Sequence, residues 1–304
     1  MSSDDDRPLL VGIETGGTKV VAAVAAAGDP EAILATTTLP TRGPDETLGD
    51  LARFTRDHGV AGSIAAVGVA SFGPLEVDPA SPGFGRLTST PKLGWQGADV
   101  LGPIGAAAPG ARVGLVTDVN GAALGEARWG AAVGEPHFAY LTVGTGVGGG
   151  VMADGRLLAG SGWPEVAHLL PRRHPEDTFA GTCPFHGDCI EGLVAGPAIA
   201  ARWGVDGSRL DAEDAAANLR FSSYYLAQLV ATLAYVAGVR LAILGGGVSK
   251  TPGLVAAVEA EVERLMGAPG STGTGGGRLR IVRPALGDES GVRGALSLAE
   301  SLLA

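Results

Sequence analysis

The chain has 304 residues, of which 45% are hydrophobic, and a formal net charge of −10. This apolar content is typical of a globular protein and excludes a disordered chain. The negative charge, with no basic stripe in the sequence, argues against a nucleic-acid partner, because clustered Lys and Arg bind phosphate backbones. Apolar runs fall short of the about 18 residues of a membrane span, and the first residues are acidic where a signal peptide is basic. We therefore expect a cytoplasmic protein without a membrane partner.

The first part of the chain opens with two apolar runs separated by a glycine-rich turn, a pattern typical of two strands joined in a hairpin. The elements expected here are strands over residues 9–13 and 20–27, a helix over 45–58, and strands over 64–70 and 113–117. Gly73 and Pro74 follow the third of these strands, and Asp118 follows the fourth directly.

The second part of the chain repeats the opening pattern, which indicates an internal duplication of a hairpin. The elements expected here are a helix over 120–129, strands over 138–143 and 147–153, a long helix over 213–238, a strand over 241–244 and a surface loop over 266–277. Alternating strands and helices predict an α/β protein, and the hairpins predict mixed sheets. We place an N-terminal lobe over 1–118 and a C-terminal lobe over 119–289, with a last helix, 290–304, that can return to the first lobe.

Three glycine-rich turns, 14–19, 144–150 and 245–247, each follow an apolar strand. Backbone without side chains lets N–H groups point at phosphate oxygens, and Thr hydroxyls add donors. Lys19 adds a point charge. A single turn of this kind is more often an ordinary hairpin, but three together favour a phosphate site. None of them matches the P-loop pattern, which excludes that fold.

Asp118 has two interpretations from its position alone. A carboxylate at a strand end can orient a hydroxyl nucleophile and accept its proton during phosphoryl transfer. Asp directly before a helix is also a good N-cap residue. The residues by themselves leave both open.

The two cysteines of the chain, Cys183 and Cys189, lie six positions apart with His186 between them and His168 upstream. In a reducing cytoplasm a disulfide is unusual, so the alternatives are a metal site and two free thiols. Four nitrogen and sulfur ligands at this spacing suit tetrahedral Zn²⁺. We leave out His174 as a solvated neighbour.

Several long stretches resemble the signatures of the ROK sugar kinases, a family of repressors, open reading frames and kinases, and within it the bacterial fructokinases. The stretches are Glu14-Thr15-Gly16-Gly17-Thr18-Lys19, Thr117-Asp118-Val119-Asn120-Gly121, residues 143–149, and, for the fructokinases, residues 71–75, 88–95 and 183–192. The similarity runs from residue 9 to about 300. It implies the actin-like (ribonuclease H-like) ATPase fold, with two lobes of mixed sheets around a central cleft.

The resemblance also implies roles for individual residues. It makes Asp118 the catalytic base and implies a homodimer. The sugar ligands it implies are Glu165, His168, Glu191, Gly73 and Pro74. The ATP site it implies comprises Gly16, Gly17, Thr18, Lys19, Gly144, Thr145, Gly146, Pro197, Gly245, Gly246, Gly247 and Lys250. Structural Zn²⁺ is expected on His168, Cys183, His186 and Cys189, and catalytic Mg²⁺ is expected with ATP. Pro91, Lys92 and Trp95 are further candidates for the sugar pocket, although a Trp in a loop is as often packed in a core.

The function that this resemblance implies is ATP-dependent phosphorylation of D-fructose to fructose 6-phosphate. Thr117 stands where many relatives have an Asn that contacts the sugar, which fits the fructokinases. Glu14 replaces a more common Asp and can still order Mg²⁺ through water. A kinase for glucose, mannose or N-acetylmannosamine is the first alternative. A non-catalytic sugar sensor would lack Asp118, and a repressor would carry a DNA-binding segment before the first strand, which here begins by residue 9.

Overall fold

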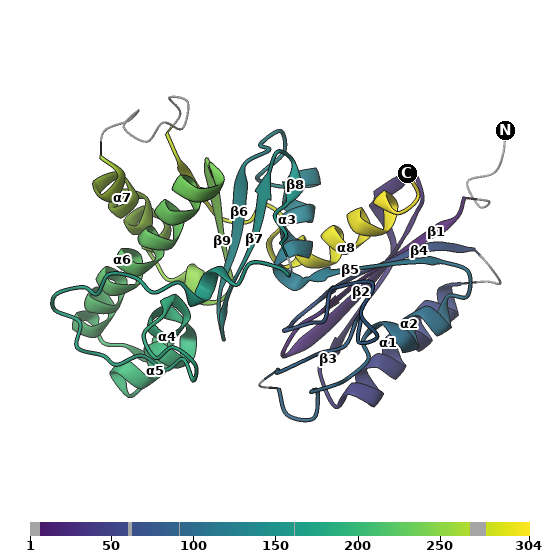
Figure 1. The fold of residues 1–304 in the computed structure, drawn as a ribbon, viewed down its shortest axis with the longest axis horizontal. Helices are drawn as coiled ribbons and strands as arrows, with labels where there is room; N and C mark the ends of the chain where they lie inside the picture. The colour runs from purple at the N-terminus through teal and green to yellow at the C-terminus, as the bar shows by residue number, and fades with distance from the viewer. Residues whose placement is uncertain (1–6, 60–62, 91, 161, 268–277) are drawn as a thin grey trace. The chain divides into compact units, whose positions relative to one another are not determined.

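The computed structural model describes residues 7–59, 63–90, 92–160, 162–267 and 278–304, and Figure 1 gives its fold. The chain divides into two compact units. The first unit contains the segment up to Val133 together with Ala159–Trp163 and Asp288–Ala304, and the second contains Gly134–Leu158 and Pro164–Gly287. The loop expected over 266–277 lies almost wholly outside the described residues.

The first unit is built on a five-stranded mixed sheet in the order β3-β2-β1-β4-β5. Its strands are β1 (Leu9–Thr15), β2 (Lys19–Ala26), β3 (Asp29–Pro40), β4 (Ile64–Ser71) and β5 (Arg112–Thr117). The first three strands form an antiparallel meander, whereas β1, β4 and β5 run parallel. Both faces of β1 and β2 are buried, which explains why these strands read as continuous apolar runs and do not alternate.

Helices cover both faces of this sheet. Leu48 and Leu51 of α1 (Pro44–His58) and Ile104 of α2 (Leu101–Ala107) join one buried cluster, on the side where Figure 1 draws these helices together. The other face packs against α8 (Ser290–Ser301), which in turn packs against α3 (Asp118–Trp129).

Close packing around α8 depends on glycine. A methyl group at Gly68 of β4 would lie 2.0 Å from the Ala295 carbonyl oxygen, and one at Gly294 would lie 1.6 Å from the Gly121 carbonyl oxygen. Because α3 packs on α8 in this way, the first segment of the first unit runs past residue 118, where the sequence placed a lobe boundary, and reaches Val133.

The second unit has a mixed sheet of its own, in the order β10-β9-β6-β7-β8. Its strands are β6 (Phe138–Val143), β7 (Val147–Ala153), β8 (Arg156–Leu157), β9 (Leu241–Gly245) and β10 (Arg280–Val282). The central strand β6 pairs antiparallel with β7 and parallel with β9, as β1 pairs with β2 and β4. Both sheets are therefore mixed, as predicted.

The helices of the second unit enclose its main buried cluster. They are α4 (Ile190–Val194), α5 (Gly196–Trp203), α6 (Ala212–Ala237) and α7 (Leu254–Met266), with single turns η2 (Val166–His168), η3 (Gly207–Arg209) and η4 (Val248–Lys250) and, at the border with the first unit, η5 (Gly287–Glu289). Asp211 caps α6 by accepting from two backbone N–H groups, and Gly238 ends it with a φ of 66°. Within the described part of the chain, no helix combines the length and hydropathy needed to cross a membrane.

Candidate functional site: three glycine turns and a cysteine–histidine cluster

The parallel strands of the first unit end in one row. Thr15, Ser71 and Thr117 are direct neighbours in the registers of β1, β4 and β5. The Thr15 hydroxyl donates to the Ser71 hydroxyl at 2.8 Å, which fixes two of these ends together. The residues that follow each strand therefore emerge side by side at one edge of the sheet. They are the turn Gly16–Lys19, the pair Gly73 and Pro74, and Asp118.

The turn that joins β1 to β2 is held by its carbonyl oxygens. The Thr41 hydroxyl donates to the carbonyl of Gly16 at 2.7 Å, Lys92 Nζ donates to that of Gly17 at 2.5 Å, and the Thr41 N–H donates to that of Thr18 at 2.9 Å. Because C=O and N–H point in opposite directions across a planar trans peptide, the amides of Gly17, Thr18 and Lys19 are directed away from these donors. The N–H groups of the turn thus point away from the residues that hold it, and the Lys19 side chain is exposed.

Asp118 is the first residue of α3, and Thr117 is the N-cap. The Thr117 hydroxyl accepts from the Asn120 N–H at 3.3 Å. Asp118 instead accepts from the N–H of its neighbour Val119 at 2.9 Å through Oδ1. The capping interpretation of Asp118 is therefore wrong, because the adjacent threonine performs that function. Asp118 is half-buried at the end of the strand row.

Glu14 is a largely buried carboxyl beside this row. Burial, and then the nearby Asp118, raise its pKa from 4.5 to about 7, against the opposing effect of Lys19. Gly291 gives it room, since a methyl group there would lie 2.3 Å from the carboxyl carbon. Among the described residues its Oε2 is buried without a hydrogen-bond partner. This donor-poor oxygen fits a hydrated Mg²⁺, which carries its own water donors.

The second glycine turn joins β6 to β7. The Gly144 N–H donates to the Gly146 carbonyl at 2.8 Å, and the Gly144 carbonyl accepts from the Gly196 N–H at 2.7 Å. The Val147 N–H donates to Glu191 Oε2 at 3.0 Å. The start of α5, where Pro197 lies, therefore touches this turn.

The third glycine turn, 245–247, follows β9, the parallel neighbour of β6. A methyl group at Gly246, whose φ is 85°, would lie 2.4 Å from the Val143 carbonyl oxygen, so glycine is required for the two strand ends to meet. The Lys250 N–H donates to the Gly247 carbonyl at 3.2 Å, and the Lys250 side chain is exposed. The predicted ATP-site residues of the second unit thus lie at one edge of its sheet.

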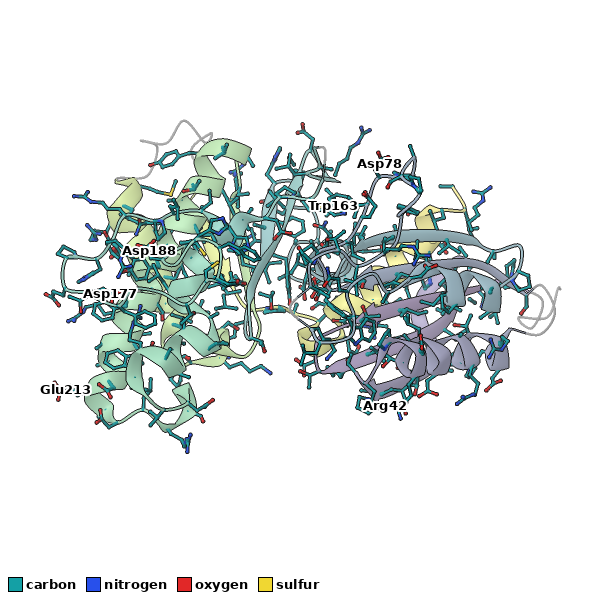
Figure 2. All side chains as sticks on the ribbon, turned by 60° about the horizontal axis from the view of Figure 1, so that its bottom comes forward. Arg42, Asp78, Trp163, Asp177, Asp188 and Glu213 are labelled. Carbon is teal, nitrogen blue, oxygen red and sulfur yellow. The ribbon has the colours of Figure 1, made fainter. Side chains whose placement is uncertain are left out.

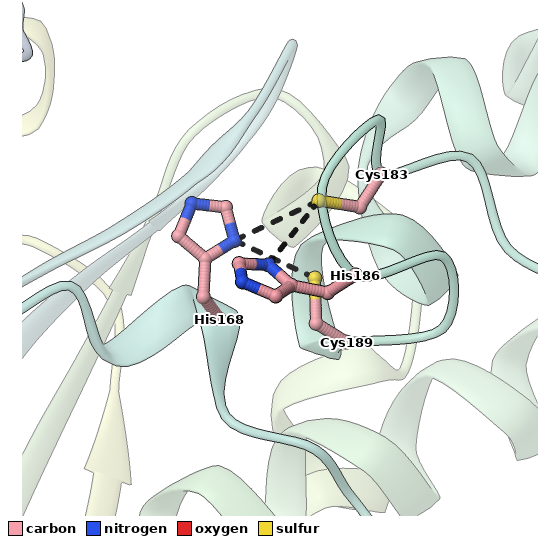
Figure 3. Close-up of side chains that lie close together, drawn as sticks. All are labelled: His168, Cys183, His186 and Cys189. Carbon is pink, nitrogen blue, oxygen red and sulfur yellow. Dashed lines mark hydrogen bonds between the residues drawn. The ribbon is translucent and has the colours of Figure 1, made fainter.

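The predicted metal ligands form one cluster (Figure 3). The ligand atoms of His168, Cys183, His186 and Cys189 all lie within 4.8 Å of one another. His168 Nδ1 is 3.8 Å from Cys183 Sγ and 3.5 Å from Cys189 Sγ, and His186 Nδ1 is 3.6 Å from Cys183 Sγ. Donors around tetrahedral Zn²⁺ are about 3.3–3.8 Å apart, given bond lengths of about 2.0–2.3 Å. Burial raises the pKa of Cys189 to about 11, so a thiolate there needs a cation as counter-charge. The donor set and spacing fit zinc.

The cluster is joined to α4 by backbone packing. Cys183 and Gly187 exchange two backbone hydrogen bonds of 3.1 and 2.9 Å, which closes the loop that carries His186. This loop rests on Gly192, where a methyl group would lie 2.0 Å from the Gly187 carbonyl oxygen. Cys189 is the N-cap of α4, so Glu191 lies in its first turn.

Glu165 directly precedes the turn η2, and His168 is its last residue. The exposed Glu165 accepts from the His168 N–H at 3.1 Å through its carbonyl. Leu169, the next residue, accepts from the Ile190 N–H at 3.0 Å. The segment with Glu165 and His168 therefore runs beside the one with Glu191.

A second anchor of the same long loop was missed by the sequence analysis. The buried Asp177 pairs with Arg202 at 3.0 Å and accepts from the Tyr225 hydroxyl at 2.6 Å. Arg173 reaches Asp177 at 3.6 Å and Asp188 at 3.0 Å, and Figure 2 shows both aspartates in the second unit. His174 packs edge-on against two aromatic rings and is half-buried, so it is more than a solvated neighbour.

The remaining candidates have other roles. Lys92 holds the first glycine turn. Trp95 is fully buried against Phe72 and donates to the Arg42 carbonyl at 2.8 Å, so it packs in the core. Pro91 lies outside the described residues.

Comparison with known proteins decides the family. The model of the ROK family matches residues 10–301. The chain belongs to the ROK family. It is 40% identical over 299 residues to the fructokinase of Zymomonas mobilis, covering 97% of each chain. It is 34% identical over 295 residues to the fructokinase of Pediococcus pentosaceus, covering 97% of this chain and 99% of that protein.

A solved ROK structure agrees with the fold. The crystal structure of the ROK hexokinase from Thermus thermophilus matches with a TM-score of 0.76 and 28% identity, over 97% of this chain and 99% of that one. The predicted actin-like ATPase fold is thereby confirmed.

Proposed function

We propose that this ROK protein transfers the γ-phosphoryl group of ATP to the C6 hydroxyl of D-fructose, giving ADP and fructose 6-phosphate. Its similarity to fructokinases along nearly the whole chain supports the assignment as an ATP-dependent hexose kinase. The observation that carries the mechanism is the row Thr15–Ser71–Thr117, because it brings a phosphate-type turn and Asp118 to one edge of a sheet.

Asp118 is the proposed general base. Its carboxylate takes the proton of the sugar hydroxyl as the hydroxyl oxygen attacks the γ-phosphorus. The bond between the γ-phosphorus and the bridging oxygen breaks, and ADP leaves with the electron pair. Asp118 is fixed at the start of α3, directly after the cap Thr117 and at the end of the strand row, which is where this role requires a carboxylate.

The phosphates of ATP are proposed to bind the two hairpin turns, and adenosine the third turn. The residues involved are Gly16, Gly17, Thr18, Lys19, Gly144, Thr145, Gly146, Pro197, Gly245, Gly246, Gly247 and Lys250. Glu14 is the residue that would hold hydrated Mg²⁺. Mg²⁺ would neutralise charge that develops on the phosphates.

The proposed sugar ligands are Glu165, His168, Glu191, Gly73 and Pro74. His168 can serve both the metal and the sugar, because its Nδ1 faces the two sulfurs while its other nitrogen points away from them (Figure 3). If Nδ1 held Zn²⁺, Nε2 would carry the proton and could donate it in a hydrogen bond to a sugar hydroxyl. The role of Zn²⁺ on His168, Cys183, His186 and Cys189 is structural.

A substrate panel tests the proposal. Zinc-loaded protein is given MgATP with fructose, glucose, mannose or N-acetylmannosamine, and kcat/KM is taken from ADP release. The highest kcat/KM is expected with fructose. A higher kcat/KM with another hexose would make that hexose the preferred substrate and would leave the assignment as a kinase unchanged. No sugar-dependent ADP release, in protein that binds ATP, would favour a non-catalytic sensor. We further propose a cytoplasmic homodimer, with the mass to be measured by light scattering.

A further inference from the structure

The turn 144–146 is held from outside its own hairpin. Glu191, 44 positions further along the chain than Val147, accepts the Val147 N–H at the end of the turn. The fit is tight, since a methyl group at Gly146 would lie 2.8 Å from the same Oε2. The Gly196 N–H binds the Gly144 carbonyl on the other side. The α4–α5 segment therefore clamps the turn at both ends.

The α4–α5 segment begins at the cysteine–histidine cluster. Cys189 is the N-cap of α4, and Glu191 follows two residues later. The loop with Cys183 and His186 packs on Gly192 without space for a side chain, and the Thr182 N–H donates to the Gly192 carbonyl at 3.0 Å. The cluster is therefore in direct backbone contact with the first turn of α4, which carries the Glu191 carboxylate.

We infer that Glu191 is a positioning residue that couples the cysteine–histidine cluster to the glycine turn 144–146, so that metal occupancy controls nucleotide affinity. The inference rests on the proposed function in taking this turn as a phosphate site. The positioning role adds to the proposed sugar contact of Glu191 and does not replace it, because the Val147 N–H binds only one of the two carboxylate oxygens. Glu191 acts through the backbone of the turn and takes no part in the chemical step.

A role as sugar ligand alone predicts a different outcome. Loss of Glu191 would then weaken sugar binding and leave ADP affinity, measured without sugar, unchanged. A positioning role predicts that ADP affinity falls and that the Val147 amide becomes exposed to exchange. Gln at this position keeps a carbonyl oxygen that can accept from Val147, so it should rescue both properties.

The experiment compares wild type, Glu191→Ala, Glu191→Gln and the control Glu213→Ala, which removes an exposed carboxylate at the start of α6 (Figure 2). Hydrogen exchange at the Val147 amide and ADP affinity by calorimetry are measured without sugar, with and without prior chelation. Elemental analysis gives the metal content.

Glu191→Ala should keep its metal, lose Val147 protection and bind ADP about tenfold more weakly, because ADP must then order a turn that has lost one charge-assisted hydrogen bond, and such a bond shifts an equilibrium by about this factor. Chelated wild type should behave in the same way, whereas the Gln variant and the control should match untreated wild type. Unchanged exchange and ADP affinity in Glu191→Ala would overturn the inference, as would a Gln variant as impaired as the Ala variant. If wild type bound no ADP, the proposed function would fail, while exchange at Val147 would still decide the coupling.

Discussion

The two sheets have the same strand order and directions, yet their glycine turns are secured differently. The turn of the first unit is preceded by its own carboxyl, Glu14, and its carbonyls are held by Thr41 and Lys92 of the same unit. The turn of the second unit is held by the carboxylate of Glu191, which follows the loop with the cysteine–histidine cluster. The repeated hairpin thus places a glycine turn at the same position in both sheets. The residues that hold each turn come from segments that differ between the two units. Thr41 and Lys92 hold the first turn, whereas the second turn is held by a segment that begins at the cysteine–histidine cluster.

The largest effect is expected at the strand row of the first unit. Asp118→Asn should lower kcat by about a thousandfold, the typical contribution of a positioned general base. Nucleotide affinity should stay near wild type, because Thr41 and Lys92 hold the first glycine turn without the help of Asp118. Steady-state kinetics with fructose and MgATP provide the measurement. Asp78→Asn, the same change at an exposed residue, is the matched control (Figure 2), and comparable activity in both variants would remove Asp118 from the mechanism.

Removal of zinc should come next and should affect the second unit. Chelation is expected to lower the melting temperature by several degrees and sugar affinity by about tenfold, equivalent to about 1.4 kcal/mol of lost binding energy. Calorimetry and sugar titration before and after chelation give both values, and added Zn²⁺ should restore them. Full activity in protein proven metal-free by elemental analysis would contradict this prediction.

The carboxyl of the first turn should make stability depend on pH. The pKa of Glu14 is raised in the folded protein to about 7, so the folded state binds the extra proton between about pH 4.5 and 7. Stability from this group is therefore present below pH 4.5 and is lost as pH rises through 7, by about 3 kcal/mol at most. Glu14→Gln should flatten the dependence. Melting temperatures of variant and wild type are measured at pH 5 and pH 7 without Mg²⁺. An equal change of melting temperature between the two pH values in both proteins would refute the prediction.

The last prediction compares the two turns by adding one methyl group to each. In Gly146→Ala the new Cβ meets Glu191 Oε2, whereas in Gly17→Ala it meets no atom within 4 Å. The first variant should lose about 1–3 kcal/mol through overpacking, and the second should melt like wild type. Thermal unfolding of both, in zinc-loaded protein without nucleotide, is the measurement. Equal melting temperatures would mean that Glu191 does not constrain the second turn.

Continuous apolar strands and the residues that end them could be predicted from the sequence, because buried strands and glycine turns have local signatures. The strand pattern predicted Asp118 at a strand end. The close spacing of Cys183, His186 and Cys189 along the chain predicted that they form one cluster. The edge strand β3 was missed, since its exposed and half-buried residues alternate, include several threonines and form no apolar run.

Contacts between distant segments could not be predicted in this way. The bond from Val147 to Glu191 and the pair Asp177–Arg202 depend on how loops fold back, which no local pattern encodes. Thr117 and Asp118 are adjacent and both suit an N-cap, so only the structure distinguishes the cap from the candidate base.

The most direct test of the central claim is the product itself. Zinc-loaded wild type is incubated with MgATP and fructose, and ADP and sugar phosphate are quantified together, with the phosphorylated position assigned by NMR. Our account predicts one fructose 6-phosphate for each ADP and no ADP release without sugar. ADP formed without an equal amount of sugar phosphate, or phosphate on another hydroxyl, would contradict it.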